Sequence, residues 1–260
     1  YRVFPSDFHE GTKMGNFAAQ TLQLETALIL AASTTYAVGV QQVFQSEFER
    51  NGGEVLEIIE FPENTSDFSG LLDRVMTLQP DCVYLAAFAA DVAQMIRGLR
   101  EREYEGTILT THAFATGRAI QEAGEGATGV FLTQTAFELD GEDPAIQEFA
   151  TAYEEKYGMP PDIYAAHGYD AIMVLAHSLE ENVVTAGDLW KGMRSLRNVM
   201  GVTGALQFDE RGDVQKFPRV YVIDAEGKLL NYENEVERRR RELLERLRAL
   251  QREAIQGGGN

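Results

Sequence analysis

The chain has 260 residues, enough for one large hydrophobic core or two modest ones. It is 44% hydrophobic and 25% charged, as is typical of a globular protein, and no apolar run approaches the ~20 residues that a membrane-spanning helix needs. The 41 acidic residues outnumber the 23 basic ones, and the formal net charge of −18 argues against nucleic-acid binding, which requires a basic face.

Strand-like and helix-like segments alternate through the first half of the chain. Short apolar runs such as TALILAA predict strands covered on both faces, and the segments between them carry apolar residues at helical spacing. The second of these helices is expected to be capped by Ser66 or Asp67 and to end before Pro80. Strands are expected at 26–32, 54–61, 82–88, 106–111 and 129–135, with helices at about 38–51, 66–79 and 91–103 and a shorter one before the last strand. This alternation predicts βαβ units, a mostly parallel sheet and right-handed crossovers.

The second half has a different character. Three amphipathic helices are expected at 143–158, 163–182 and about 186–196, and no strand between them is available to cover their apolar faces. Strands follow at 204–208 and 219–224. A strong helix is then expected over 233–256, with an apolar seam formed by Val236, Leu243, Leu247, Leu250 and Ala254. We interpret this helix either as a solvated helix that docks on its own domain or as a linker or dimer contact.

Nothing in the sequence identifies an enzyme, a cofactor or a metal site. The segment GEGATG at 124–129 fits the glycine pattern of a dinucleotide-binding loop, but a helix precedes it and a strand follows it, the reverse of the required order. The four histidines are scattered, and no two carboxylates are placed for acid–base chemistry. The single cysteine, Cys82, excludes an internal disulfide and lies in an apolar run typical of a buried thiol. We therefore expect no cofactor, no metal and no catalytic residue.

Three strand ends carry side chains suited to a small-molecule site. In open parallel sheets, ligands bind at the carboxyl ends of the strands, where the chain leaves for the next helix. Here those ends are STTY at 33–36, Phe88, and TTHAF at 110–114. Hydroxyl, aromatic and imidazole groups of this kind are the usual composition of a pocket with apolar walls. The alternative interpretation is that the hydroxyl residues cap the next helix and the aromatic residues close the end of the sheet.

The order of the motifs resembles that of solute-binding proteins of the branched-chain amino acid (Leu/Ile/Val) ABC transporter family. SDFSGLLDRVMTLQPDCVYLAAF is similar to the family's D-F-S helix start and its P-D before a strand, and TYAVGV to its Y-G strand exit. AAHGYDAIMVLAHSL resembles its Y-D-A helix, and GALQFDERGDV its late G-x-x-x-F-(D/N)-x-x-G-D segment. The resemblance runs in order from Tyr1 to about Tyr232. It implies an α/β type I periplasmic-binding fold, in which two lobes joined by three crossover strands close on a ligand by hinge motion.

The resemblance also implies a division of the chain. Residues 1–7 would form the first crossover, residues 8–115 with 214–232 the second α/β lobe, and residues 116–213 the other crossovers and the helical remainder of the first lobe. Residues 233–256 would be the C-terminal helix and 257–260 a disordered end. Because the start of the chain resembles the family's first crossover, a signal peptide and the sheet of the first lobe are expected upstream of it.

The resemblance carries ligand-binding roles to particular residues. Tyr36 lies where the family places a ligand-contacting tyrosine, Phe88 where amino-acid binders often have a tyrosine, and His112 where they commonly use an acid to pair with the ligand's ammonium. A cationic histidine would repel an ammonium, whereas a neutral one could accept a hydrogen bond from it. A ligand with an anionic or uncharged group near His112 is therefore as consistent with the sequence as an α-amino acid. Thr111 and Ser33, from the same strand ends, complete the expected ligand-binding set.

These inferences predict a non-enzymatic, extracytoplasmic solute-binding protein. It would capture an amino acid or related compound between two lobes and deliver it to the membrane permease of a bacterial ABC importer. The alternative is a sensor or regulatory module of the same fold, such as a receptor ectodomain or an envelope-enzyme activator, and an α/β enzyme is the third interpretation. Self-association through the C-terminal helix or the exposed first-lobe helices is a further expectation, and nucleic acid is not expected as a partner.

Overall fold

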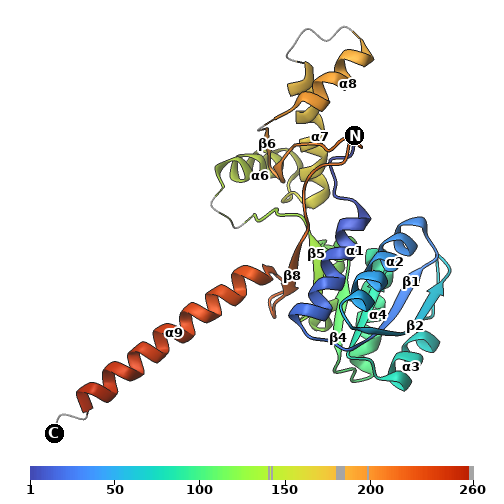
Figure 1. Ribbon diagram of the computed structural model, residues 1–260, viewed down its shortest axis with the longest axis vertical. Coiled ribbons are helices and arrows are strands. Elements are labelled where there is room, and N and C mark those ends of the chain that lie inside the picture. Colours follow the sequence, from blue (N-terminus) through green and yellow to red (C-terminus); the bar gives the residue numbers. More distant parts are fainter. Residues whose placement is uncertain (140, 142, 180–184, 198, 258–260) are drawn as a thin grey trace.

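A seven-stranded sheet is the centre of the larger unit, which we call the α/β lobe (Figure 1). The computed structural model describes residues 1–139, 141, 143–179, 185–197 and 199–257. The strand order is β2-β1-β3-β4-β5-β8-β9, with the first five strands parallel and β8 antiparallel to both β5 and β9. The strands are β1 (Thr26–Ala32), β2 (Glu54–Phe61), β3 (Cys82–Ala86), β4 (Thr107–Thr110), β5 (Phe131–Gln134), β8 (Arg219–Ile223) and β9 (Leu229–Asn231).

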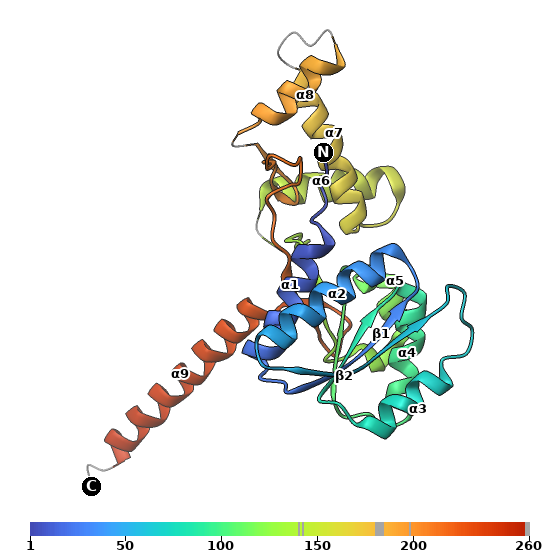
Figure 2. The ribbon, with the colours of Figure 1, turned by 45° about the vertical axis from the view of Figure 1, so that its right-hand side comes forward.

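Helices cover both faces of this sheet (Figure 2). One face carries α1 (Asp7–Asn16), which continues into a π-helical turn η1 (Phe17–Thr21), and α2 (Thr35–Arg50); the other carries α3 (Ser69–Leu78), α4 (Ala89–Glu101) and α5 (Gly117–Ala123). Two short 3-10 turns, η2 (His112–Phe114) and η3 (Gly124–Ala127), complete the lobe. Because both faces are covered, β3 is buried throughout and β1 at every residue after the first. The predicted alternation of strands and helices and the mostly parallel sheet are thus confirmed.

Helices α1 and α2 lie unusually close together because α1 carries two glycines one turn apart. A Cβ atom at Gly11 would lie 2.7 Å from the carbonyl oxygen of Val40, and one at Gly15 would lie 2.9 Å from that of Phe44. No real side chain fits at such separations, so only glycine permits this contact. The contact fixes how α1 lies along α2.

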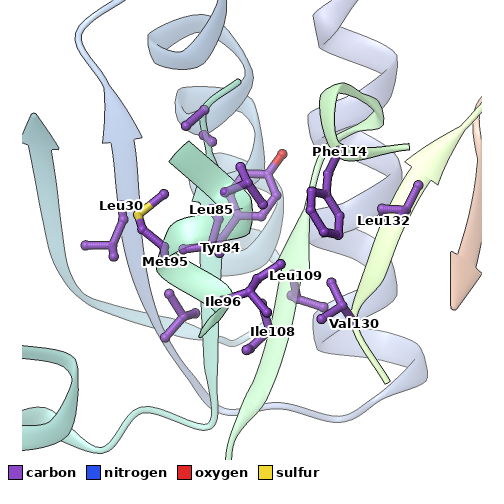
Figure 3. Close-up of a cluster of buried hydrophobic side chains, with 14 of the residues drawn as sticks. Leu30, Tyr84, Leu85, Met95, Ile96, Ile108, Leu109, Phe114, Val130 and Leu132 are labelled. Atoms are coloured by element: carbon purple, nitrogen blue, oxygen red, sulfur yellow. The ribbon is translucent and has the colours of Figure 1, made fainter. Parts of the chain in front are cut away.

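The apolar core fills the space between the sheet and its helices (Figure 3). On the α2 side, the ring of Phe44 stacks on that of Tyr84 with centroids 4.1 Å apart. Cys82 is buried among these groups, and burial raises the pKa of its thiol, as expected from the sequence. Other fully buried members are Leu30, Leu85, Ile96, Ile108, Phe114 and Leu132, which Figure 3 labels.

A smaller unit, which we call the helical unit, lies above the α/β lobe in the view of Figure 1. It consists of α6 (Pro144–Tyr157), α7 (Ile163–Leu179), α8 (Ala186–Ser195) and a ribbon of β6 (Met200–Gly201) and β7 (Gly204–Ala205). Its apolar side chains form two small clusters. Along α7, large apolar side chains are exposed: Tyr169, Ile172, Leu175 and Leu179. As the sequence predicts, these helices have no sheet to cover them beyond the ribbon within the described residues.

A buried carboxylate holds the helical unit to the chain segment before β8. Asp170 of α7 accepts hydrogen bonds from the backbone N–H groups of Val202 and Thr203, at 2.8 and 3.0 Å, and from the Thr203 hydroxyl. The ammonium of Lys216 lies 3.5 Å from the same carboxylate. All three polar side chains are buried. A Cβ atom at Gly201 would clash with the Asp170 carboxylate, so the glycine is required there.

Separate chain segments connect the two units side by side (Figure 1). The first of these segments, residues 1–6, pairs with the segment that leads into β8. The backbone N–H of Arg2 donates to the carbonyl oxygen of Gly212, and the N–H of Val214 donates to the carbonyl oxygen of Arg2. The sheet continues past the expected lobe boundary at residue 115, since β5 pairs with β4 and β8. The α/β lobe therefore includes α5, η3 and β5, which the sequence-based division assigned to the other part.

Helix α9 (Tyr232–Gly257) projects away from both units (Figures 1 and 2). Its first turn packs on α1, with the Tyr232 ring 4.9 Å from that of Phe17 and Lys13 paired with Glu233 at 3.2 Å. Further along, Val236, Leu243, Leu244 and Leu247 are exposed, while the side chains of Leu250 and Ala254 lie outside the described set. Within the described residues, the helix thus docks on its own lobe by its start and is solvated along the rest, as the first of the two interpretations predicts. None of the described helices has the length and apolar character needed to cross a membrane.

Some boundaries differ from the expected ones. Helix α3 begins at Ser69, with Phe68 as its N-cap residue and Asp67 accepting from the Ser69 N–H at 2.9 Å, so Asp67 satisfies this end without starting the helix. The expected strand at 204–208 keeps only two residues, and β6 and β9 were not expected. The expected end of the helix at 180–182 and the chain end at 258–260 lie outside the described residues.

Candidate functional site

Three of the expected site residues meet at one edge of the sheet. Strands β1, β3 and β4 are parallel neighbours, so their carboxyl ends lie side by side. Tyr36 follows β1 in the first turn of α2, Phe88 is the N-cap of α4, and His112 begins η2 after β4. The Tyr36 ring lies 5.8 Å from that of Phe88, nearly parallel to it, and 5.6 Å from the His112 ring. We call these three side chains the sheet-edge cluster.

Of the two hydroxyl residues of the expected set, Thr111 lies beneath the cluster beside Tyr36, and only Ser33 lies elsewhere. Thr111 is fully buried, and its hydroxyl accepts from the Ala113 N–H at 3.3 Å. Ser33 is exposed and lines an open groove of about 520 Å³ on the other side of the α2 start, with Gln42 and Glu60. The N-cap of α2 is Thr34, whose hydroxyl accepts from the Ala37 N–H at 3.1 Å. The hydroxyls at 34 and 111 thus follow the capping interpretation that the sequence left open.

A buried glutamate that the sequence reasoning missed lies beneath the sheet-edge cluster. One carboxylate oxygen of Glu10, Oε1, accepts from the backbone N–H of His112 at 2.7 Å and from the Thr133 hydroxyl of β5 at 2.6 Å. The other, Oε2, accepts from the Tyr36 hydroxyl at 3.0 Å. Nδ1 of His112 lies 2.8 and 2.9 Å from the two oxygens. Glu10 therefore connects α1, α2, η2 and β5 at a single point.

A signal for Glu10 was present in the sequence. Within SDFHEGTKMGNFA, Gly11 and Gly15 form the contact face of α1, and Glu10 and Met14 share that buried face. A glutamate on the same buried helix face as a methionine is unusual, because a buried carboxylate needs hydrogen-bond donors or cations beside it. That spacing marks Glu10 as a member of a polar network, although the partners themselves come from distant segments.

Aromatic rings from the helical side of the molecule border the same cluster. Phe4, in the first connecting segment, lies between two histidines, with ring centroids 4.6 Å from His112 and 4.4 Å from His167 of α7. Tyr164, in the first turn of α7, lies 6.2 Å from both Phe4 and His112 and is 43% exposed. The cluster therefore has walls from both units. Sequence reasoning could not place these rings beside Tyr36. Phe4 precedes the first strand of the sheet, and the rings of α7 lie more than a hundred residues after Tyr36 in the chain.

Burial and close partners set the charges in this region. Burial would raise the pKa of Glu10, but the neighbouring His112 and the hydrogen bonds to it outweigh that effect, and the pKa is lowered. Burial would lower the pKa of His112, but Glu10 outweighs it and the pKa is raised above 6.5. Burial and Glu10 raise the pKa of Tyr36, so its hydroxyl keeps its proton. Burial lowers the pKa of His167 to about 4, which makes that imidazole neutral at pH 7.

The remaining chemistry of the site is that of binding. No group of three or more His, Cys, Asp or Glu side chains able to hold a metal ion occurs among the residues that the structure describes. The sheet-edge cluster combines apolar ring surface with hydroxyl and imidazole groups, and its walls come from both units. Such a surface can hold a small molecule by stacking and by a few directed hydrogen bonds.

Comparisons with known proteins identify the family of the chain. The sequence model of the periplasmic binding protein family matches residues 1–228. A Pseudomonas aeruginosa protein named as a leucine-, isoleucine-, valine-, threonine- and alanine-binding protein is 23% identical over 220 residues, which make up 84% of this chain and 58% of that protein. The chain thus spans little more than half of that relative. The match ends before α9, which begins at Tyr232.

Solved structures give the same result for the fold. A leucine-binding protein from Thermotoga maritima superposes with a TM-score of 0.82 at 28% identity, covering 88% of this chain and 66% of that one. A solute-binding protein of an ABC transporter from R. palustris, solved with benzoate, superposes with a TM-score of 0.80 at 20% identity, covering 89% of this chain and 64% of that one. The expected type I periplasmic-binding fold is therefore confirmed.

Proposed function

Because the chain belongs to the periplasmic binding protein family, we propose that it is part of an extracytoplasmic solute-binding protein that captures a small molecule between two lobes for an ABC importer. The proposal includes binding without chemistry, at Tyr36, Phe88 and His112, and delivery of the ligand to a membrane permease. Its relatives named for amino-acid binding support the class of solute, while the benzoate complex of a structural neighbour widens it.

The observation that carries this proposal is the position of the aromatic rings. The sheet-edge cluster belongs to the α/β lobe, whereas Tyr164 and His167 belong to α7 of the helical unit. The connecting segments run between these units, and rotation about such segments would open or close the space between the rings. A solute held by rings from both sides would stabilise the closed arrangement.

The test is ligand binding by the full-length protein, screened by thermal shift and measured by calorimetry. Tyr36→Ala removes a stacking surface and should weaken binding of the solute found by about tenfold or more, with little change in the unfolding temperature. His112→Ala should weaken binding as well. Tyr157→Ala is the matched control, because Tyr157 is an exposed tyrosine of α6 outside the cluster. Unchanged affinity in both site variants would remove this cluster from the binding site.

Helix α9 favours a second candidate function, a sensor or regulatory module of the same fold. The family match ends at residue 228, and α9 then projects into solvent with an exposed apolar seam. Deletion of residues 236–260 separates the two functions in a strain that depends on the protein for solute uptake. An importer component should restore uptake without α9, whereas a sensor that uses α9 as output should bind its ligand and yet lose its cellular effect.

A further inference from the structure

The two ring nitrogens of His112 have different surroundings. Nδ1 and the backbone N–H of His112 both point at the Glu10 carboxylate, at 2.7 to 2.9 Å. A carboxylate is an acceptor only, so Nδ1 carries a proton in this arrangement. Among the described residues, Nε2 has no hydrogen-bond partner, and the side chain keeps 15% of its surface exposed. Nε2 is therefore the nitrogen available to a ligand.

Glu10 itself is not available. Its oxygens already accept from the His112 backbone and ring, from Thr133 and from Tyr36, and its side chain is only 5% exposed. A ligand ammonium would have to displace one of these donors to reach the carboxylate. Glu10 therefore acts as a positioning residue, which sets the orientation and charge of His112 from behind.

The rings around His112 show what the rest of the ligand would meet. Tyr36 and Phe88 form one nearly parallel pair, with 22° between their planes, and Phe4 and Tyr164 form another, with 12°. Phe88 is 52% exposed, so apolar surface is open to a ligand beside the imidazole. A compact ligand with an apolar body and one polar end fits these surroundings.

We propose that His112, held as an imidazolium by Glu10, receives the anionic end of the ligand, and that the ligand is a small carboxylate with an aromatic or branched apolar body. This rests on the proposed function, because it names the solute class of the same site. An imidazolium Nε2–H donates a charge-assisted hydrogen bond to a carboxylate, whereas it repels an ammonium. The charge of His112 therefore selects against cationic ligands.

Two carboxylates and three groups that are neutral at pH 7 face His112. Asp7 and Glu10 face it from α1, Tyr36 from α2, and Tyr164 and His167 from α7. The two tyrosines have raised pKa values and His167 has a pKa of about 4, so these three groups are neutral at pH 7. Glu10 and the neighbouring Asp7 both favour the protonated imidazole. Carboxylate binding should consequently weaken as the pH rises through the raised pKa of His112, by at most about tenfold per pH unit.

The first experiment uses the full-length protein and two sets of probes matched in shape. One set is benzoate, benzamide and benzylamine; the other is 4-methylpentanoate, 4-methylpentanamide and 4-methylpentylamine. Calorimetry should find that a carboxylate binds at least about tenfold tighter than its amide and its amine. The preference should decline as the pH rises through the raised pKa of His112. An amide or amine that binds as tightly as its carboxylate, or a flat pH profile, would overturn the proposal.

The second experiment changes the residue behind His112. Glu10→Gln removes the negative charge but keeps the side-chain size, so carboxylate affinity at neutral pH should fall about tenfold and the pH profile should move to lower pH, while amide affinity stays the same. Glu47→Gln is the matched control. It removes a buried carboxylate of α2 that lies about three turns beyond Tyr36, and it should change neither the carboxylate affinity nor the pH profile. Equal effects of the two substitutions would contradict the positioning role of Glu10.

Two further readouts keep the inference testable. If Glu10→Gln does not fold, nitrogen NMR of the unaltered protein reports the ring: an imidazolium at pH 7 supports the proposal, and a neutral ring overturns it. Binding of only uncharged or cationic solutes from a wider panel would also overturn it, while leaving solute capture intact. A full panel without any bound solute would count against the proposed function itself.

Discussion

The α/β lobe and the helical unit contain similar amphipathic helices but bury them to different extents. In the lobe, helices on both faces of the sheet cover the central strands β1 and β3, whose side chains are almost all inaccessible. In the helical unit, α8 has no buried residue and α7 leaves Ile172 64% exposed. The lobe therefore draws its stability from apolar burial, whereas the helical unit depends more on the buried network of Asp170. Helical periodicity alone does not tell which of these two situations a helix occupies.

The same difference bears on the candidate site. Glu10, Tyr36 and His112 are held by the well-buried lobe and by one another through hydrogen bonds. Tyr164 approaches them from the less completely buried unit. We infer that the lobe supplies a fixed recognition edge, and that the helical unit supplies the surface that moves against it.

The largest expected effect is a cavity in the core of the lobe. Phe44→Ala removes a fully buried ring that stacks on Tyr84 and Phe48, and should lower the free energy of unfolding by about 4 kcal/mol. Phe8→Ala, at an exposed phenylalanine of α1, should cost less than about 1 kcal/mol. Urea denaturation measures both. Similar losses would show that the lobe does not rely on its core in the way its burial indicates.

The next effect lies in the helical unit. Asp170→Asn leaves the buried ammonium of Lys216 without a charged partner and should cost about 3 kcal/mol. Amide exchange should show faster opening in α7 and α8 than in the sheet, because the members of the network lie in α7, in the ribbon and in the segment before β8, and none lies in the sheet. Asp73→Asn, at an exposed ion pair with Arg102, should cost less than about 0.5 kcal/mol. Equal protection changes in both units would contradict the separation drawn above.

A smaller effect is expected at the helix contact that supports Glu10. Gly11→Ala forces a Cβ atom against the backbone of Val40 and should cost about 2 kcal/mol. Gly70→Ala, in the open first turn of α3, meets nothing within 4 Å and should instead stabilise the chain by a few tenths of a kcal/mol to about 1 kcal/mol. Thermal unfolding of the pair measures opposite shifts. A stable Gly11→Ala would mean that α1 can move away from α2 without loss.

The sequence predicted the lobe well because its local signals agree with its tertiary contacts. The bounds of β1 and β2 were predicted correctly: β1 has the continuous apolar run that a buried parallel strand requires, and β2 is a half-buried strand whose apolar residues are interrupted by three glutamates. The short strands β6 and β9 could not be predicted, and the expected strand at 204–208 shrank to β7, because two or three residues carry no periodicity. The lobe boundary was misplaced at residue 115 because the return of β5 to the sheet depends on long-range pairing, which local patterns do not encode.

The candidate site was predictable only where chain order determines position. Parallel neighbours bring their carboxyl ends together, so Tyr36, Phe88 and His112 could be grouped from the sequence. Glu10 could not be joined to them, since its contact with His112 spans 102 residues and depends on the glycine contact between α1 and α2. Their roles in ligand binding stay predictions until a solute is found.

Two histidines near the border of the units should give the stability a maximum near pH 6.5. His112 has a raised pKa, so the folded state binds more protons than the unfolded state above that pH, and stability is lost as the pH rises through the raised pKa. His167 has a pKa of about 4, so the unfolded state binds more protons below pH 6.5, and stability falls toward pH 4. Each slope is at most about 1.4 kcal/mol per pH unit.

Denaturation across this pH range tests the two assignments separately. His112→Gln should flatten the alkaline side only, and His167→Gln the acidic side only. A change on the opposite side in either variant would show that another group sets the slope.

The smallest effect is expected on the exposed face of α7. A substitution there tests directly whether the helical unit is less buried than the lobe. Ile172→Ser replaces a mostly exposed apolar side chain and should change the free energy of unfolding of this chain by less than about 0.5 kcal/mol, while reducing the binding of an apolar dye. The same substitution at Val174, a buried neighbour on the same helix, should cost several times more, because it places a hydroxyl among Leu206 and Val214. A large loss at Ile172 would mean that this face is packed in solution, and that the helical unit is buried as thoroughly as the lobe.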